Sequence, residues 1–275
     1  MARIKRALKV SAKDAELPRT RAELFGRIIR EDFYLTVDLS LAELLFSLPL
    51  IAVLFAGYAI IASVEIKPQT VFPIVFWFAL AAAVLCGIKY VGRNACFSVM
   101  KKRAHNEGCF IIPEILRSVK SSGGKSFLLG LIVGFSAFFA AAGSVYMIFF
   151  SETFFKWVAI GALAVLFLLF YCAAEYFMAS ENFYDLKFFV QLKNSMLFAV
   201  AKFPASLLFF ALTVGIKFAA ALFSFWAWII VSLVFSLTLS GLSVAAATLY
   251  AHAAFDKYIN EKNHPDIVGK GLLKD

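Results

Sequence analysis

Long apolar stretches, separated by short polar segments, dominate the chain between Glu43 and Asp256. Six of these stretches approach the ~20 residues that an α-helix needs to cross the hydrocarbon core of a bilayer. They lie at about 43–64, 69–90, 126–150, 156–176, 199–221 and 227–250. The pattern predicts an all-α, polytopic membrane helix bundle with six transmembrane helices.

The last two spans come from one apolar stretch, residues 203–255, in which only Lys217 and His252 can carry a charge. At ~1.5 Å rise per residue this stretch is too long for a single crossing. We divide it at residues 224–226, where polar and interfacial aromatic side chains meet. Lys217 is then expected to extend its ammonium group to the outer surface.

Lysine and arginine are distributed unevenly about these spans. Of the 27 Lys and Arg residues, only Lys67, Lys156 and Lys217 fall on the side of the three short links. The others lie in the terminal segments and the two long loops. Because basic residues are retained on the cytoplasmic side, we expect both termini and both long loops in the cytoplasm, with the chain in a bacterial inner membrane.

The formal net charge of +9 follows from this distribution. Nucleic-acid-binding proteins combine a clustered basic patch with a stacking or groove-binding motif. Here the basic residues are spread over four segments beside apolar spans, and no such motif accompanies them. We therefore expect no nucleic-acid partner, and anionic lipid headgroups on the cytoplasmic face as the default partner.

The chain divides into a basic, amphipathic cytoplasmic arm at 1–38, the transmembrane domain at 39–255 and a cytoplasmic tail at 256–275. The first apolar stretch begins near residue 40, so no cleavable signal peptide is expected. Five apolar residues of the arm recur at helical spacing and predict an amphipathic helix at 21–34. They are Leu24, Phe25, Ile28, Ile29 and Phe33. We expect this helix on the inner leaflet, with docking of a soluble partner as the alternative.

The residue pattern of each long loop predicts a further amphipathic helix. In the first loop, Pro113 can open a helix at its first turn, and we expect this helix to lie on the membrane and lead into the third span. In the second loop, residues 183–196 carry a polar stripe of Lys187, Gln191 and Asn194 beside apolar positions. The shared pattern leaves open an internal duplication, of the kind that underlies many transporters.

Four charged residues lie close to the predicted cytoplasmic boundary of the spans: Glu43, Lys89, Arg93 and Glu175. The simpler interpretation is that their side chains reach water, since each is within about one helical turn of the boundary. The alternative is a polar cluster at the cytoplasmic mouth of the bundle, in which a Glu–Lys pair lowers the cost of burying both charges. Spans two to four carry too few polar groups for a central proton relay or ion path.

Small and hydroxyl residues form stripes on two spans. One stripe on span three contains Gly130, Gly134, Ala137 and Ala141, and one on span six contains Ser232, Ser236, Ser240 and Ser243. Such stripes allow close helix approach and interhelical hydrogen bonds. We therefore expect intramolecular packing faces, while the serine stripe also allows a second interpretation, a polar path for a substrate.

The sequence contains no recognisable catalytic motif, such as a nucleophile elbow, a zinc-protease helix or a phosphate-binding loop. Its histidines, His105, His252 and His264, are far apart in the chain. The four cysteines are Cys86, Cys96, Cys109 and Cys172, and their spacing matches neither a redox nor a zinc pattern. We expect reduced thiols, no metal, no cofactor and no enzymatic activity.

Several short segments resemble the YesL-like bacterial integral membrane proteins, a family of unknown function. The segments are Ser47-Leu48-Pro49, Phe110, Ser118-Val119-Lys120, Lys193-Asn194-Ser195, Gly241 and Phe255-Asp256-Lys257-Tyr258. The resemblance covers roughly residues 40–260. It implies a helical membrane protein without an assigned activity and with an accessory role near carbohydrate uptake systems, and it transfers no catalytic residue.

The sequence therefore predicts a non-enzymatic accessory or assembly partner of a transport system, with transporter subunits as partners. A small-solute transporter or permease is the alternative, with its path between spans one, two, four and six. A membrane-embedded enzyme that modifies a lipid is the third hypothesis, and it would depend on Glu43 or Glu175.

Overall fold

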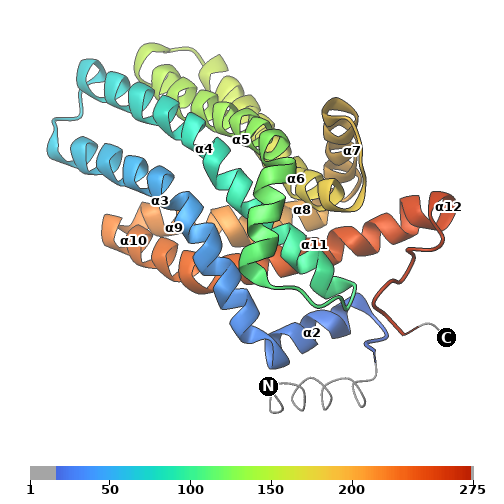
Figure 1. Cartoon of the computed structure of the whole chain (residues 1–275). Coiled ribbons are helices and arrows are strands. Elements are labelled where there is room, and N and C mark those ends of the chain that lie inside the picture. The colour runs from blue at the N-terminus through green and yellow to red at the C-terminus, as the bar shows by residue number, and fades with distance from the viewer. Residues whose placement is uncertain (1–16, 274–275) are drawn as a thin grey trace.

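The computed structural model describes residues 17–273, and this part of the chain is built from α-helices with no β-strand (Figure 1). The α-helices are α2 (Arg21–Glu31), α3 (Phe33–Ser63), α4 (Pro68–Ala104), α5 (Ile111–Phe150), α6 (Phe155–Phe183), α7 (Phe188–Ala201), α8 (Phe203–Phe210), α9 (Ile216–Phe223), α10 (Phe225–Val234), α11 (Ser240–Phe255) and α12 (Glu261–Asn263). Three π-helical segments join neighbouring α-helices: η1 (Ala211–Gly215), η2 (Phe235–Leu239) and η3 (Asp256–Asn260).

Six continuous helices are long and apolar enough to cross a membrane. They are Phe33–Ser63, Pro68–Ala104, Ile111–Phe150, Phe155–Phe183, Phe203–Phe223 and Trp226–Asn263. The predicted bundle of six apolar helices is thereby confirmed, and the fold is that of a multi-pass membrane protein. Which side of the membrane the termini face stays a prediction from the Lys and Arg distribution.

The division of the last apolar stretch falls where it was expected. Ser224 has an extended backbone, with φ −169° and ψ 161°, and separates α9 from α10. Its Oγ accepts a hydrogen bond of 3.1 Å from the backbone N–H of Ala227. A serine in this position satisfies one of the N–H groups that a helix start leaves unbonded. The fifth span begins at Phe203, later than predicted, because the chain turns at Lys202 and restarts with Pro204 in the first turn of α8.

The helix predicted to open at Pro113 and lead into the third span is present and is continuous with that span; its placement on the membrane stays a prediction. Pro113 lies in the first turn of α5, which continues without interruption to Phe150. Instead of breaking, α5 changes direction along its length (Figure 1). The hydroxyls of Ser121 and Ser122 donate to the carbonyl of Ser118 at 3.3 and 3.0 Å, a bond that bends helices.

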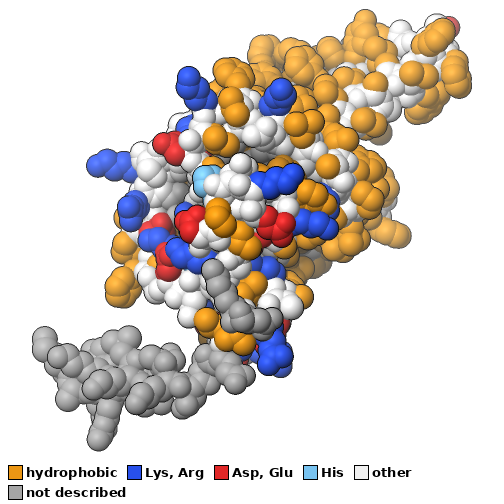
Figure 2. Space-filling view, turned by 90° about the vertical axis from the view of Figure 1, so that its right-hand side faces the viewer, with side chains coloured by type: hydrophobic (Ala, Val, Ile, Leu, Met, Phe, Trp, Pro, Cys, Tyr) orange, Lys and Arg blue, Asp and Glu red, His pale blue; other side chains and the backbone are white. Residues whose placement is uncertain are grey.

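One end of the bundle is charged, and the opposite end carries the three short turns between α3 and α4, α5 and α6, and α9 and α10 (Figure 1). The charged end contains α2, the final turns of α4 and α6, and the segment after α11. Figure 2 shows Lys, Arg, Asp and Glu side chains gathered over part of the surface, with hydrophobic side chains covering the rest. This division fits a molecule with its apolar surface in lipid and one end in water.

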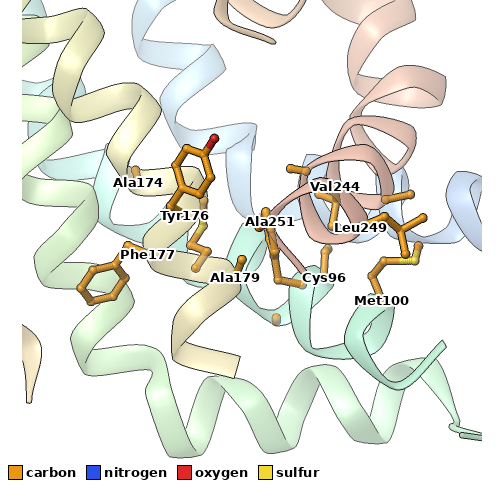
Figure 3. Packing of buried hydrophobic residues seen from close by; sticks show 14 of the residues in the cluster. Cys96, Met100, Ala174, Tyr176, Phe177, Ala179, Val244, Leu249 and Ala251 are labelled. Atoms are coloured by element: carbon orange, nitrogen blue, oxygen red, sulfur yellow. The ribbon is translucent and has the colours of Figure 1, made fainter. Parts of the chain in front are cut away.

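The main hydrophobic core lies toward the charged end, where α4, α6 and α11 meet. Figure 3 labels Cys96 and Met100 of α4, Tyr176 and Phe177 of α6, and Val244 and Leu249 of α11 among its members. Beyond this core, large apolar side chains such as Phe223 and Leu222 are mostly exposed. In lipid such exposure costs nothing, because acyl chains are as apolar as the side chains.

Helix α2 uses its apolar face within the chain. Thr20 caps it, accepting a hydrogen bond from the backbone N–H of Glu23 at 3.1 Å. Leu24 and Ile28 are buried against α3 and α11, whereas Ile29 is exposed. The helix ends at Glu31. Because Leu24 and Ile28 pack inside the chain, the prediction that the apolar face lies on the inner leaflet is wrong for these two residues. Residues 1–16 of the predicted arm lie outside the described residues.

The helix predicted at residues 183–196 is present as α7, which begins later, at Phe188, and turns the polar residue Gln191 toward the inside of the bundle. Gln191 is fully buried and donates to the Phe177 carbonyl and to Ser180 Oγ, both at 3.0 Å. Phe189, in contrast, is 78% exposed. In water this arrangement would be unfavourable, but in lipid a polar side chain gains more from a partner inside the protein. Gln191 and Ser195 therefore face the bundle, whereas Lys187 of the predicted polar stripe is exposed, as is Phe189.

Glycines allow two helix pairs to touch through their backbones. A Cβ atom on Gly241 of α11 would lie 2.0 Å from the Thr36 carbonyl oxygen of α3, and one on Gly134 of α5 would lie 2.3 Å from the Ala83 oxygen of α4. The Gly241 N–H also donates to Ser40 Oγ at 2.8 Å. The predicted packing role of the span-three stripe holds for Gly134, while Ala141 is exposed.

We expect the substitution Gly241→Ala to destabilise the bundle by about 1–3 kcal/mol, because α3 must move away from α11 to admit the methyl group. Unfolding by denaturant in detergent micelles measures this change. Gly161→Ala is the matched control: its Cβ would meet no atom within 4 Å, so the better helix former should be neutral or stabilising by about 0.5–1 kcal/mol. Equal effects of both substitutions would contradict the close crossing.

Candidate functional site: a buried ion-pair network beside an intramembrane cavity

Three charged residues from three long helices form one buried network. Arg93 of α4 donates from Nη1 to both carboxylate oxygens of Glu43 of α3, at 3.0 and 2.9 Å. Its Nε and Nη2 donate to the two oxygens of Glu175 of α6, each at 3.0 Å. The planar guanidinium thus holds two carboxylates at once, which a lysine ammonium cannot do with the same geometry.

Hydroxyl groups of α11 complete the network. Ser240 Oγ donates to Glu43 Oε2 at 2.5 Å, and Arg93 Nη2 donates to Ser243 Oγ at 3.3 Å. The neighbouring Gly92 lets α4 lie against α3 here, since a Cβ atom would come within 2.4 Å of the Phe46 side chain. The network therefore ties four spanning helices together at one level.

Glu43, Arg93 and Glu175 do not reach water: their exposed fractions are 5%, 5% and 6%. The simpler interpretation from the sequence, side chains extended to the boundary, is therefore wrong for these three. The structure brings them together, and the partner of both carboxylates is Arg93, where a Glu–Lys pair was expected. Desolvation of charges in a bilayer is costly, so such groups are stable only when they pair with each other.

Lys89 lies one turn before Arg93 on α4 and does not join the network directly. No carboxylate of the described residues is within ion-pair distance of its ammonium group. It is half-buried and lines a cavity of about 450 Å³ that reaches Glu43. Its charge is still close enough to attract Glu43 and Glu175.

This cavity, which we call the central cavity, lies inside the bundle, between α3, α4, α5 and α6 on one side and α9 and α10 on the other. Its polar lining comprises Glu43, Ser47, Lys89, Tyr90, Tyr171, Lys217, Ser232, Ser236 and Ser240. The remaining lining is mostly apolar and includes Leu50, Ile51, Leu54, Phe55, Phe167, Ile229, Leu233 and Phe235. Concave, mainly apolar sites with a few convergent polar groups are typical of small-molecule binding.

The serine stripe of the sixth span divides between two roles. Ser232, Ser236 and Ser240 line the central cavity, whereas Ser243 bonds Arg93. Ser236 lies in η2, where the helix widens to a π-helical turn. Such turns are frequent at functional sites.

Lys217 does not extend to the outer surface, contrary to the prediction from its position. It lines the central cavity, and its Nζ lies 3.9 Å from the centroid of the Phe235 ring. The physical reason is that an ammonium group inside the hydrocarbon region gains from a nearby aromatic face and from Glu43. Sequence position alone predicts the depth of a side chain, but it does not predict the direction in which the side chain points.

A second cavity, of about 250 Å³, lies on the other side of the network. Glu175, Cys172, Tyr176 and Ser206 are among its lining residues. Glu43 borders the central cavity and Glu175 borders the second one, so the Arg93 network contributes one carboxylate to each. Nothing in the spacing of the sequence predicted this second cavity.

A pair of histidines meets at the charged end, although His105 and His252 are far apart in the chain. Their ring centroids are 5.1 Å apart, and Phe183 stacks on His252 at 4.5 Å. Arg21 Nη2 lies 3.4 Å from His252 Nε2 and 3.3 Å from Asp256 Oδ2. One nitrogen of each histidine is buried without a hydrogen-bond partner: Nε2 of His105 and Nδ1 of His252.

The histidine pair does not amount to a metal centre. Within residues 17–273, no three His, Cys, Asp or Glu side chains are grouped closely enough to hold a metal ion. Cys96, close to His105 in sequence, instead points its Sγ at the Leu39 carbonyl, 3.5 Å away. All four cysteines are free thiols.

Comparisons with known proteins found no relative of this chain. No family model, no curated protein and no solved structure matches the chain. The resemblance to the YesL-like family therefore stays an expectation from short segments of sequence.

Removing the central cation of the network leaves two buried carboxylates unpaired. We expect Arg93→Met to destabilise the fold by about 3–5 kcal/mol, measured by denaturant unfolding in detergent micelles. Arg117→Met is the matched control, because Arg117 is exposed on α5, and we expect it to stay within about 0.5 kcal/mol of the natural chain. A similar effect of the two substitutions would contradict the structural role of the network.

The histidine pair predicts a pH dependence of stability. Burial, with smaller contributions from Lys270 and Lys101, lowers the pKa of His105 to about 4. As the pH falls below about 6.5, the unfolded chain takes up a proton at this residue before the folded chain does. Stability should therefore decrease from neutral pH toward pH 4, and His105→Gln should reduce this slope. His264→Gln, at an exposed position, should leave the slope unchanged; an unaltered slope in His105→Gln would contradict the assignment.

Proposed function

We propose that the chain is a small-solute transporter whose solute enters the central cavity. The observation that carries the proposal is the cavity itself. Two lysines and four serines of the spanning helices line a space of about 450 Å³ in an otherwise apolar bundle. Ionisable residues inside a membrane are costly and mark substrate or ion pathways by default.

The position of the network supports this proposal. A transporter needs a barrier that separates an opening on one side from an opening on the other, and substrate sites lie between helices that move against each other. Arg93 bonds Glu43 beside the central cavity and Glu175 beside the second cavity. Separation of either pair would open a polar connection between the two spaces, so the network is suited to the role of a gate.

The other two hypotheses from the sequence have weaker support. Docking of a transport subunit on α2 would require its apolar face, but Leu24 and Ile28 are buried within the chain. Acid–base chemistry on a lipid would require a carboxyl group that can gain and lose a proton. Both Glu43 and Glu175 are bound by Arg93, which favours a holding role for them.

Accessibility of the cavity to water tests the proposal. In a chain with its four cysteines replaced by serine, Ser236→Cys places a thiol in the central cavity. Val234→Cys is the control, because Val234 lies two residues away, is 50% exposed and does not line the cavity. Membrane-impermeant methanethiosulfonate reagents are applied to sealed vesicles of either orientation.

We expect Ser236→Cys to react about tenfold faster than Val234→Cys or more, because only a hydrated thiol ionises to the reactive thiolate. Rates are followed by mass spectrometry of the intact chain. Failure of Ser236→Cys to react from either side of the membrane would contradict a solute path through this cavity.

A further inference from the structure

The charges around the central cavity do not balance. Arg93 is shared by two carboxylates, Glu43 and Glu175, whereas Lys89 and Lys217 have no carboxylate of the described residues within ion-pair distance. Three cationic side chains therefore face two anionic ones. An excess positive charge inside the hydrocarbon region is costly, and an anion bound in the cavity would compensate it.

The hydroxyl groups that line the cavity add hydrogen-bond donors to this excess of positive charge. Ser240 is used by Glu43, and Ser47 donates to the backbone carbonyl of Glu43 at 2.8 Å. The side-chain hydroxyls of Ser232 and Ser236 form no hydrogen bond with any other described residue, and both serines line the cavity. Two ammonium groups and two free hydroxyls thus offer donors with no acceptor of their own, which is the arrangement that a carboxylate or phosphate group requires.

The apolar side chains that line the rest of the cavity indicate the chemistry of the remaining part of the ligand. Ile51, Leu54 and Phe55 of α3 face Ile229 and Leu233 of α10 across the cavity. A hydrophilic anion such as a sugar phosphate would bury its hydroxyls against these side chains without hydrogen bonds, which is unfavourable. An alkyl or isoprenoid chain, in contrast, would gain contact with them and with the lipid outside.

We infer that the central cavity binds an amphiphilic anion, with one negatively charged head group between Lys89 and Lys217 and an apolar chain between α3 and α10. This inference rests on the proposed function in that it names the class of solute for the same cavity. The head group is a carboxylate or a phosphate, supplied either by a free fatty acid or by a membrane phospholipid.

The fluorescence of Trp228, which lines the cavity, provides a direct measurement. The full chain carries phenylalanine in place of its other three tryptophans and is placed in nanodiscs of zwitterionic phosphatidylcholine at about pH 7, where a carboxylic acid in water is ionised. Dibromostearate is the probe, because its bromine atoms quench nearby indole rings. Its methyl ester is the matched ligand control, with the same chain and no charge.

We expect saturable quenching by dibromostearate and only gradual, non-saturable quenching by the ester. Lys217→Gln and Lys89→Gln should each weaken binding about tenfold, which corresponds to ~1.4 kcal/mol, whereas Lys217→Arg should retain it. Lys156→Gln, in the first turn of α6 and outside the cavity lining, should bind as the natural chain does. Neither Lys217→Gln nor Lys89→Gln removes an ion pair. A single gel-filtration peak for each variant verifies that it folds.

Competition distinguishes the two sources of the ligand. Displacement of dibromostearate when the nanodiscs contain phosphatidylglycerol would identify a phospholipid as the occupant, and retention would identify a free fatty acid; both support the inference. Displacement by inorganic phosphate, equal binding of the ester, or unchanged binding by Lys217→Gln would overturn it.

The two experiments distinguish failure of the transport proposal from failure of the anion-binding inference. Saturable binding without reaction of the thiol in Ser236→Cys would overturn transport and leave a lipid-binding site. Reaction of that thiol without saturable quenching would overturn the amphiphilic anion and leave a transport path for another solute.

Discussion

The guanidinium group of Arg93 is the interaction on which the bundle depends. It is bonded by Glu43 and Glu175 and touches Ser243, so α3, α4, α6 and α11 all meet at one buried cation. In an apolar solvent the helices have no hydrophobic reason to associate, and specific polar contacts and close packing take that role. The network supplies the polar contact, and the glycine crossings supply the close packing. Both cavities exist because the helices meet at these points and diverge between them.

The structure also separates two uses of charge. At the network, one cation bonds two carboxylates within hydrogen-bond distance, so each charged group has a partner inside the chain. In the central cavity, Lys89 and Lys217 are left with an aromatic ring and a few hydroxyls. The first arrangement is suited to holding helices, and the second is suited to binding something from outside the chain. Their contact through Glu43, which belongs to both, gives an occupant of the cavity a direct means of weakening the Glu43–Arg93 pair.

The sequence predicted the number of spans, because this number follows from the length and position of the apolar stretches. It did not predict helix rotation. In spans that are apolar all round, nothing in the pattern says which face meets a neighbour, so the pairing of Glu43 with Arg93 and the inward direction of Lys217 were missed. The direction of α7 was also left open by the pattern: the polar side of an amphipathic helix faces water in a soluble protein, but Gln191 faces the bundle here. His105 and His252 were missed because only the tertiary fold brings them together.

The crossing at Gly241 has a mechanical consequence. With the Thr36 carbonyl and Ser40 hydroxyl in direct contact with the α11 backbone, the two helices cannot slide past each other without a clash, so a relative motion would have to change their crossing angle. The π-helical turn of η2 follows immediately on one side, and beyond it α10 has few buried side chains. The crossing at Gly241 would therefore act as a pivot point, about which α10 changes its tilt. A small tilt at Gly241 becomes a larger displacement at Ser232 and Trp228, so the width of the cavity mouth is set by the angle of a single helix crossing.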